Sequence, residues 1–201
     1  MPNTADKPLK LAVDLAPYHA RARATWFMGP GWYMDAMERL SDVVQQLSQA
    51  HTLDKITEIV RKASRDLTMS DGATFVLRDG DECYYADEDA ISPLWKGRRF
   101  MMSTCISGWV MLNGEPAIIE DIYKDRRIPH DAYRPTFVKS LVMVPIRRTA
   151  PIGAIGNYWA MHHVPSKEEL SVLQALADTT SVALRNIELT EALKESRKQQ
   201  V

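Results

Sequence analysis

Cysteine and long apolar runs are scarce in this sequence. Its 201 residues include only two cysteines, Cys83 and Cys105, too few for a disulfide framework and typical of the reducing cytoplasm. No run of about 18 apolar residues is present, so we expect no transmembrane helix. The first ten residues lack the apolar segment of a signal peptide. These absences predict a cytoplasmic protein without a membrane contact.

An excess of charge of one sign is also lacking. The 25 basic and 26 acidic residues give a formal net charge of −1. A nucleic-acid interface needs a basic face or a high isoelectric point. The basic clusters at 96–99 and 147–148 are short, and we interpret them as solvated strand ends rather than phosphate-binding sites. We therefore expect no nucleic-acid partner. The composition, 45% hydrophobic and 25% charged, is that of a globular domain.

Motifs for metal and phosphate binding are missing as well. The only adjacent histidines are His162 and His163, which point to opposite faces of an extended chain. No His-x-x-x-His or Cys-x-x-Cys spacing occurs, so no metal site is predicted. There is no Walker or GxGxxG sequence, and the glycine-spaced segment 151–156 belongs to a predicted strand. The sequence therefore leaves any cofactor unknown.

Apolar spacing predicts helices at both ends of a domain. The first helix covers residues 34–49. Its predicted buried residues are Met37, Leu40, Val44 and Leu47. Thr52 can cap a second helix, and Ser166 with Glu169 forms a capping box at the start of a helix of about 30 residues. The predicted stripe of this last helix is Leu170, Leu173, Ala177, Thr180, Leu184 and Ile187.

Residues 1–33 show no sustained period, and prolines interrupt them. They nevertheless contain large aromatic residues, among them Trp26, Phe27, Trp32 and Tyr33. We expect these side chains to dock onto the domain or onto a partner subunit.

Several short apolar segments between the helices predict strands. They cover residues 73–77, 82–86, 98–102, 116–119, 140–146 and 152–161. Residues 87–95 are acidic and predicted to be irregular. Ser107–Asn113 is predicted to be a small helix that ends at a left-handed Gly114. Pro116 confines its strand to an edge, whereas 140–146, apolar on both faces, is predicted to be central.

This order of elements predicts an α+β domain. One antiparallel sheet carries the helices on one face and the loops on the other. Three phrases, Ile106–Val110, Asp121–Tyr123 and Val142–Ile146, resemble the GAF domain family, especially the sensor modules of bacterial two-component histidine kinases. The resemblance covers roughly residues 34–199. It implies a GAF/PAS-like sheet with terminal helices on one face and ligand-pocket loops on the other.

The long loop after the edge strand is the best candidate for a functional site. A loop of this length is more than a connector and is interpreted as the lid of a pocket. Small-molecule sites are apolar cavities with a few convergent polar groups. The candidate ligand-binding residues are Trp109, Asp121, Tyr123, His130, Tyr133, Arg134 and Tyr158. Aromatic walls suit a planar ligand, and Arg134 or His130 can hold an acidic group. Alternatively these residues only close the domain, with Asp121 capping the loop and Trp109 filling the core.

Cys105 supports an alternative function. It precedes the small helix, whose dipole can lower the pKa of its thiol, so the chain can be a thiol-based redox sensor or enzyme. No cysteine-hydrolase motif surrounds it, however. The alternative is that both cysteines serve only as small buried apolar side chains.

The resemblance argues against two specialised GAF types and gives no support for a third. Bilin-binding members carry a Cys-His pair before the central strand. The cysteine position falls near Ile128 and Pro129, where this chain has no cysteine, and His130 lies one residue from the expected histidine, so no covalent bilin is expected. Free-methionine sulfoxide reductases carry a cysteine where this chain has Ser107, and others in the loop, which has none here. The pattern of the cyclic-nucleotide members cannot be placed in this sequence.

The resemblance therefore implies a regulatory, non-catalytic sensor of a bacterial signal-transduction protein. Its partners would be an unknown small molecule, a second copy bound through the terminal helices, and an output such as a histidine kinase domain. We expect an N-terminal extension at 1–33, the GAF domain at 34–165 and a signalling helix at 166–201. A purely structural dimerisation module is a further alternative. Since the last helix reaches Val201 without a stop signal, we expect a piece of a longer protein or a partner in trans.

Overall fold

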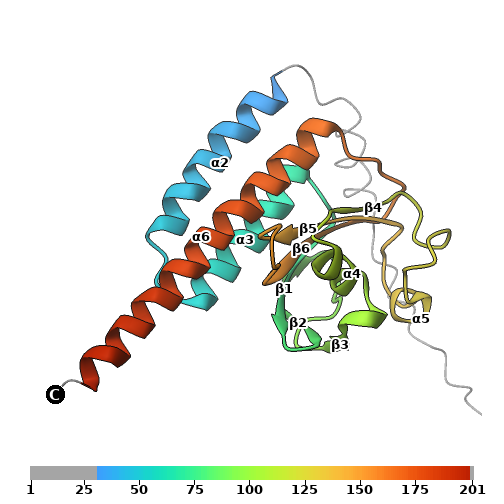
Figure 1. Cartoon of the computed structure of the whole chain (residues 1–201). Coiled ribbons are helices and arrows are strands. Elements are labelled where there is room, and N and C mark those ends of the chain that lie inside the picture. Colours follow the sequence, from blue (N-terminus) through green and yellow to red (C-terminus); the bar gives the residue numbers. More distant parts are fainter. Residues whose placement is uncertain (1–30, 200–201) are drawn as a thin grey trace, which may run out of the picture.

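The computed structural model describes residues 31–199, which form a six-stranded sheet between a layer of long helices and a layer of loops and short helices (Figure 1). The helices are α2 (Trp32–Ser48), α3 (Leu53–Thr68), η1 (Met102–Thr104), α4 (Ile106–Asn113), α5 (His130–Tyr133) and α6 (Lys167–Lys198). The strands are β1 (Gly72–Asp79), β2 (Glu82–Ala90), β3 (Arg99–Met101), β4 (Ala117–Ile119), β5 (Ser140–Ile146) and β6 (Gly153–Trp159). This arrangement confirms the predicted α+β architecture.

The strands follow the order β3-β2-β1-β6-β5-β4, and all neighbours are antiparallel. β4 lies at the edge, directly after Pro116, as predicted. All residues of β5 and β6 are buried. Their two faces belong to different cores, since Ile155 and Trp159 pack in the helix-side core whereas Ala154 and Tyr158 pack in the loop-side core. These two strands therefore form a wall shared by both layers.

The buried face of α2 differs from the predicted one. Leu40 and Leu47 are buried as expected, but Met37 is 38% and Val44 is 40% exposed. Val43 is buried in place of its neighbour Val44. Apolar residues occupy a wide arc of this helix, and packing against α3 and α6 selects only part of that arc.

The start of α2 also differs from the prediction. The helix begins at Trp32, so Trp32 and Tyr33 belong to it rather than to an irregular extension. Trp32 packs at the margin of the helix-side core, and Tyr33 is exposed. Trp26 and Phe27, for which docking was also expected, lie outside the described residues.

β2 runs to Ala90 and so includes acidic residues that we predicted to be irregular. Aspartate is disfavoured in strands, which is why the sequence signal stops early. In the fold, Asp87 accepts a hydrogen bond from Arg61 of α3 at 2.6 Å, and Asp89 accepts one from Arg65 at 2.6 Å. These partly buried ion pairs balance the acidic residues and attach α3 to the sheet.

α6 begins with the predicted capping box. The Glu169 N–H donates to Ser166 Oγ at 3.0 Å, and the Ser166 N–H donates to Glu169 Oε2 at 3.3 Å. The helix has 32 residues, close to the length expected. The predicted stripe is buried at Leu173, Ala177, Thr180 and Leu184 and half-buried at Leu170 and Ile187. Most of the helix beyond Leu184 is exposed.

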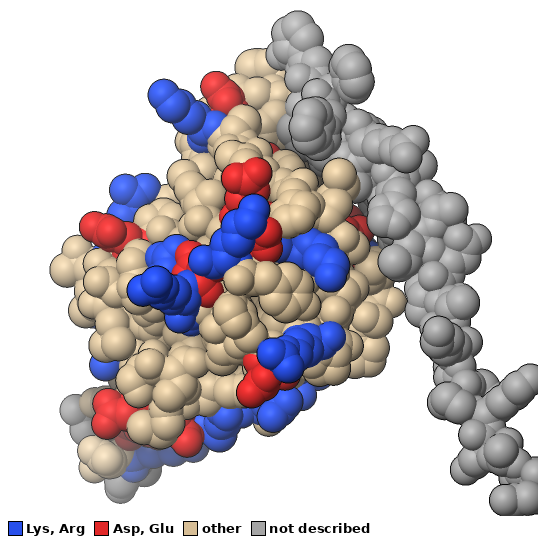
Figure 2. All heavy atoms as spheres, turned by 90° about the vertical axis from the view of Figure 1, so that its right-hand side faces the viewer, with Lys and Arg blue, Asp and Glu red and all other residues tan. Residues whose placement is uncertain are grey.

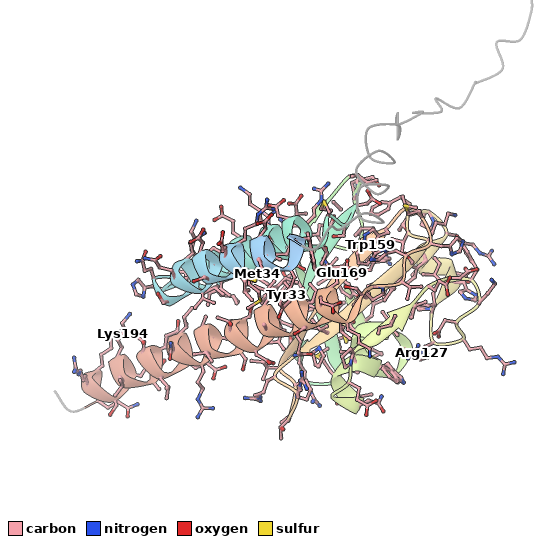
Figure 3. The ribbon with its side chains drawn as sticks, turned by 90° about the horizontal axis from the view of Figure 1, so that it is seen from above. Tyr33, Met34, Arg127, Trp159, Glu169 and Lys194 are labelled. Carbon is pink, nitrogen blue, oxygen red and sulfur yellow. The ribbon has the colours of Figure 1, made fainter. Side chains whose placement is uncertain are left out.

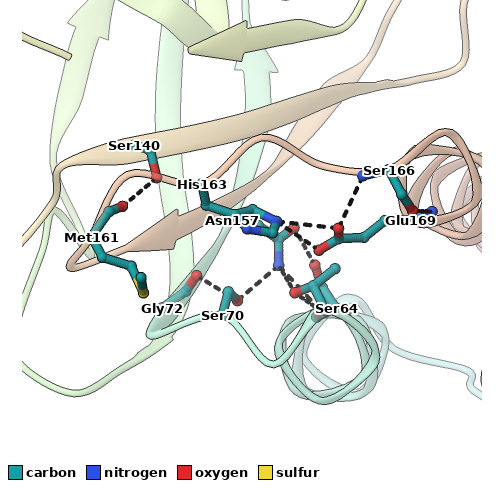
Figure 4. A network of polar contacts seen from close by, with 10 residues as sticks. Ser64, Ser70, Gly72, Ser140, Asn157, Met161, His163, Ser166 and Glu169 are labelled. Carbon is teal, nitrogen blue, oxygen red and sulfur yellow. Dashed lines mark hydrogen bonds and ion pairs between the residues drawn. The ribbon is translucent and has the colours of Figure 1, made fainter. Parts of the chain in front are cut away.

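A buried polar network joins α3 to β6 (Figure 4). The Asn157 amide accepts from Ser64 Oγ at 2.7 Å and donates to the Ser64 carbonyl at 3.1 Å. It also contacts Thr68 Oγ1 at 3.0 Å and Ser70 Oγ at 3.1 Å. Buried polar groups have no water to bond, so these partners hold α3 at one position on the sheet.

Replacing Asn157→Ala should lower the free energy of unfolding by about 2–3 kcal/mol, because it leaves buried hydroxyl and carbonyl groups without partners. The measurement is urea denaturation followed by circular dichroism. Asn186→Ala makes the same change on the exposed side of α6 and should alter stability by no more than about 0.5 kcal/mol. Equal effects of the two substitutions would show that the network does not stabilise the fold.

Candidate functional site

A pocket of about 350 Å³ opens between the long loop and the segment formed by η1 and α4. This volume is at the small end of the range for ligand sites. The lining residues are Met102, Ser103, Thr104, Cys105, Trp109, Leu112, Arg126, Arg127, Ile128 and Pro129. The pocket thus combines apolar walls with two arginines and a thiol.

The close packing of α4 on η1 forms one wall of this pocket. A Cβ on Gly108 would lie 1.8 Å from the Met102 carbonyl oxygen, so only glycine allows the two segments to meet. At the other end of α4, Gly114 takes the predicted left-handed conformation, with φ of 66°. These two glycines set the position and the length of the helix that carries Trp109.

A stacked cation forms the opposite wall. The Arg127 guanidinium lies 4.4 Å from the centre of the Trp109 ring, a cation–π contact between the loop and α4. Asp125 accepts from Arg127 Nη2 at 2.6 Å and from Arg127 Nε at 3.0 Å. Hydrogen bonds from Arg127 hold the pKa of the Asp125 carboxyl below its usual range. Arg127 therefore attaches the loop to α4, and Asp125 holds Arg127 in position.

Two of the predicted site residues, Tyr133 and Tyr158, meet in the core of the loop side. Both rings contact Trp95, with ring centres 4.6 Å and 5.5 Å away. The Tyr158 hydroxyl lies 2.9 Å from Thr74 Oγ1, whereas the buried Tyr133 hydroxyl has no hydrogen-bond partner among the described residues. Burial raises the pKa of both hydroxyls.

The other predicted residues lie apart from this aromatic cluster. His130 Nε2 lies 3.0 Å from the Ile122 carbonyl oxygen and so attaches α5 to the loop. Asp121 accepts from the Tyr123 N–H at 3.0 Å, which is the loop-capping role considered as an alternative. Arg134 and Tyr123 are exposed. Of the seven candidates, only Trp109 lines the pocket; the assignment of the others to a ligand remains a prediction.

Sequence analysis did not identify several residues of the pocket. Arg126 and Arg127 lie in the same loop as the chosen residues, and the adjacent arginines were the signal available. Trp95, which packs in the loop-side core and does not line the pocket, was also missed because it follows a strand that was predicted too short. Glu88 holds Trp95 in place, accepting backbone N–H bonds from residues 94–96 at 2.8–2.9 Å.

Cys105 is buried at the start of α4 and lines the pocket. Its sulfur lies 3.2 Å from Ser107 Oγ, which in turn lies 3.1 Å from the Tyr85 hydroxyl. A hydrogen bond from the Cys83 thiol, aided by Ser107 and by the N–H groups of Gly108 and Ser107, lowers the pKa of Cys105 despite its burial. The same contact raises the pKa of Cys83.

The family model of the GAF domain matches residues 50–185. The chain belongs to the GAF domain family. This match spans the sheet, the layer of loops and short helices, α3 and the packed half of α6, and it begins after α2. GAF domains are small-molecule-sensing and regulatory modules, and this general role applies to the chain. No curated protein gives a significant match.

Solved GAF structures share the fold. The GAF domain of a phosphoenolpyruvate-protein phosphotransferase from Coxiella burnetii is similar at a TM-score of 0.70 with 16% identity, over 80% of this chain and 98% of that one. Its counterpart from Acinetobacter gives 0.68 and 17%, over 78% and 97%. A free methionine-R-sulfoxide reductase from Neisseria meningitidis, solved with its substrate, gives 0.67 and 14%, over 77% and 91%. At these identities the likeness concerns the fold alone.

Two further properties concern the described residues only. Within 31–199, no helix combines the length and the apolar character needed to cross a bilayer. The same residues contain no group of three or more histidine, cysteine, aspartate or glutamate side chains arranged to hold a metal ion.

Replacing Gly108→Ala should destabilise the protein by about 3 kcal/mol or more, because the new methyl group collides with the backbone of η1. Thermal and urea unfolding would measure this loss. Gly31→Ala is the matched control, since a Cβ there meets nothing within 4 Å, and only a capping cost of about 1 kcal/mol is expected. A wild-type unfolding midpoint for Gly108→Ala would contradict the close packing of α4 on η1.

Proposed function

We propose that this chain is the regulatory, non-catalytic sensor module of a cytoplasmic bacterial signal-transduction protein, linked to a histidine kinase or another output domain. The proposal rests on the exposed second half of α6. This helix starts against the sheet and continues as an exposed rod beyond the domain (Figure 1). Such a helix joins a folded sensor to a distant output.

The pocket favours a small ligand that carries negative charge. Arg126 lines the pocket beside Arg127, whose guanidinium pairs with Asp125 and stacks on Trp109. Arg126 would therefore be the cation that meets a ligand. Guanidinium groups bind carboxylates and phosphates with paired hydrogen bonds. Acidic and basic residues are interspersed over the face that carries the long loop (Figure 2). The preference for a negatively charged ligand would therefore come from the residues inside the pocket and not from the charge of the whole surface.

A continuous path of packed elements leads from the pocket to α6. α4, which carries Trp109, packs on β5 and β6, and α6 packs on β5. Because Val142 and Val144 face the helix-side core while Leu141 and Met143 face the loop side, β5 contacts both. A ligand would shift α6 only if it binds two arrangements of these elements with different affinity.

The terminal helices supply a surface for a second copy. α2 and α6 run side by side in the same direction (Figure 3), with Tyr33 and Met34 at one end and Lys194 at the other. Exposed apolar residues occur on both helices: Tyr33, Met34, Met37, Val44, Val182, Leu189 and Leu193. Apolar positions on adjacent helices are typical of a helical dimer interface, so we propose a homodimer formed through α2 and α6.

The ligand is tested first by native mass spectrometry of the purified protein, with small carboxylates and phosphates then added as probes. A bound acid should raise the melting temperature, and Arg126→Ala should weaken its binding about tenfold through the lost charged hydrogen bond. Arg148→Ala is the control because that side chain is exposed in the turn after β5 and does not line the pocket. Equal losses in both variants would place the ligand elsewhere.

The dimer is tested by light scattering during gel filtration. Val182→Glu should shift the protein toward the monomer, because it places a charge on the exposed apolar side of α6. Lys194→Glu introduces the same residue about 120° around the helix and should leave the dimer intact. A monomeric wild type, or a dimer unaffected by Val182→Glu, would contradict the interface.

A further inference from the structure

Two thiols from separate segments of the sequence lie in one buried cluster beside the pocket. Cys83 lies on β2, opposite Phe100 of β3. After β3 the chain turns back through η1, whose Met102 N–H donates to the Asp81 carbonyl at 2.9 Å. This turn places Cys105 over β2, because Ser107 links Cys105 to the hydroxyl of Tyr85, and alternation along the strand puts Tyr85 on the same face of β2 as Cys83. The sequence separation of the two residues hides this pairing.

The surroundings of the two thiols are polar although the site is buried. Ser107 Oγ lies 3.2 Å from Cys105 Sγ and 3.1 Å from the Tyr85 hydroxyl. A structural cysteine in an apolar core has no such partners. The hydrogen bonds to Cys105 stabilise its thiolate, the nucleophilic form of the side chain.

The two thiols differ in access. Cys105 is 6% exposed and lines the pocket, the side from which a small solute would approach it. Cys83 is fully buried behind it. An oxidant would therefore meet Cys105 first, with Cys83 in position for a second step.

We propose that Cys105 and Cys83 form a peroxide-responsive pair that closes a reversible intramolecular disulfide. The Cys105 thiolate attacks the O–O bond of a small hydroperoxide, becomes a sulfenic acid, and releases water or an alcohol once the leaving oxygen is protonated. The Cys83 thiol then attacks the Cys105 sulfur, and the sulfenic oxygen leaves as water. The peroxide is reduced by two electrons, and the two thiols are oxidised to one disulfide.

This disulfide would connect redox state to the pocket. It would join β2 to the start of α4, the helix that carries Trp109 and Leu112 on the pocket wall. Oxidation would thus restrict α4 whether or not a ligand is bound. The inference goes beyond ligand sensing, and it can hold even if the pocket binds no metabolite.

The first test uses the full wild-type chain without ligand, with hydrogen peroxide as the probe. At neutral pH the folded protein should lose both free thiols and the mass of two hydrogens, and proteolysis should yield a peptide pair that joins Cys83 to Cys105. Dithiothreitol should restore both thiols. The reaction should be at least about tenfold faster than in urea-unfolded chain, where only a few per cent of a free thiol is ionised. A folded chain that reacts more slowly than the unfolded chain would overturn the proposal.

Two matched variants assign the order of the steps. Cys83→Ser should stop at a sulfenic acid on Cys105, which dimedone traps, and Cys105→Ser should leave Cys83 reduced. Circular dichroism checks that both variants fold, and the wild-type comparison stands if either does not. Oxidation of Cys105→Ser at the wild-type rate, or disulfides that join two chains, would overturn the proposal. Because no ligand enters this assay, its failure is separate from a failure of the proposed sensor function.

Discussion

The burial of β5 and β6 on both faces is the constraint on which the other features depend. Each strand must supply apolar side chains to two cores at once, with Ile155 and Trp159 on the helix side and Ala154 and Tyr158 on the loop side. The sheet is therefore one wall shared by the long helices and the pocket layer. A change in the packing of either layer acts on the same seven-residue strands, and closely packed interiors transmit such changes.

Polar contacts then determine how each layer sits on that wall. Asn157 points from β6 into the helix layer, and Arg61 and Arg65 attach α3 to the acidic end of β2. On the opposite side, Gly108 lets α4 approach η1, and the Arg127 stack on Trp109 attaches the loop to α4. Apolar burial supplies most of the stabilisation, whereas these directional contacts select one arrangement of the layers.

The pocket and the thiol pair share α4. Trp109 and Leu112 contribute to the pocket wall from this helix, and Cys105 stands at its N-terminus. A ligand held by the loop arginines and a disulfide to Cys83 would both act on the position of the same short helix. Since α4 packs on β5 and β6, both inputs would reach α6 through the shared wall.

Local sequence signals determined much of the fold. The capping box of Ser166 and Glu169, the left-handed Gly114 and the edge position after Pro116 were predictable, because each depends on backbone rules that act over a few residues. The two-sided apolar run of β5 was equally clear. These signals, with the GAF-like phrases, were sufficient for the architecture and the family.

Tertiary structure alone decided which of several suitable residues are used. Val43 is buried rather than Val44 because the contacts with α3 and α6 fix the rotation of α2. Tyr133 and Tyr158 meet Trp95 in a core, whereas Arg127 reaches Trp109 at the pocket. Proximity between residues far apart in the sequence has no local signature, since it arises only when the sheet closes and the loops fold back over it.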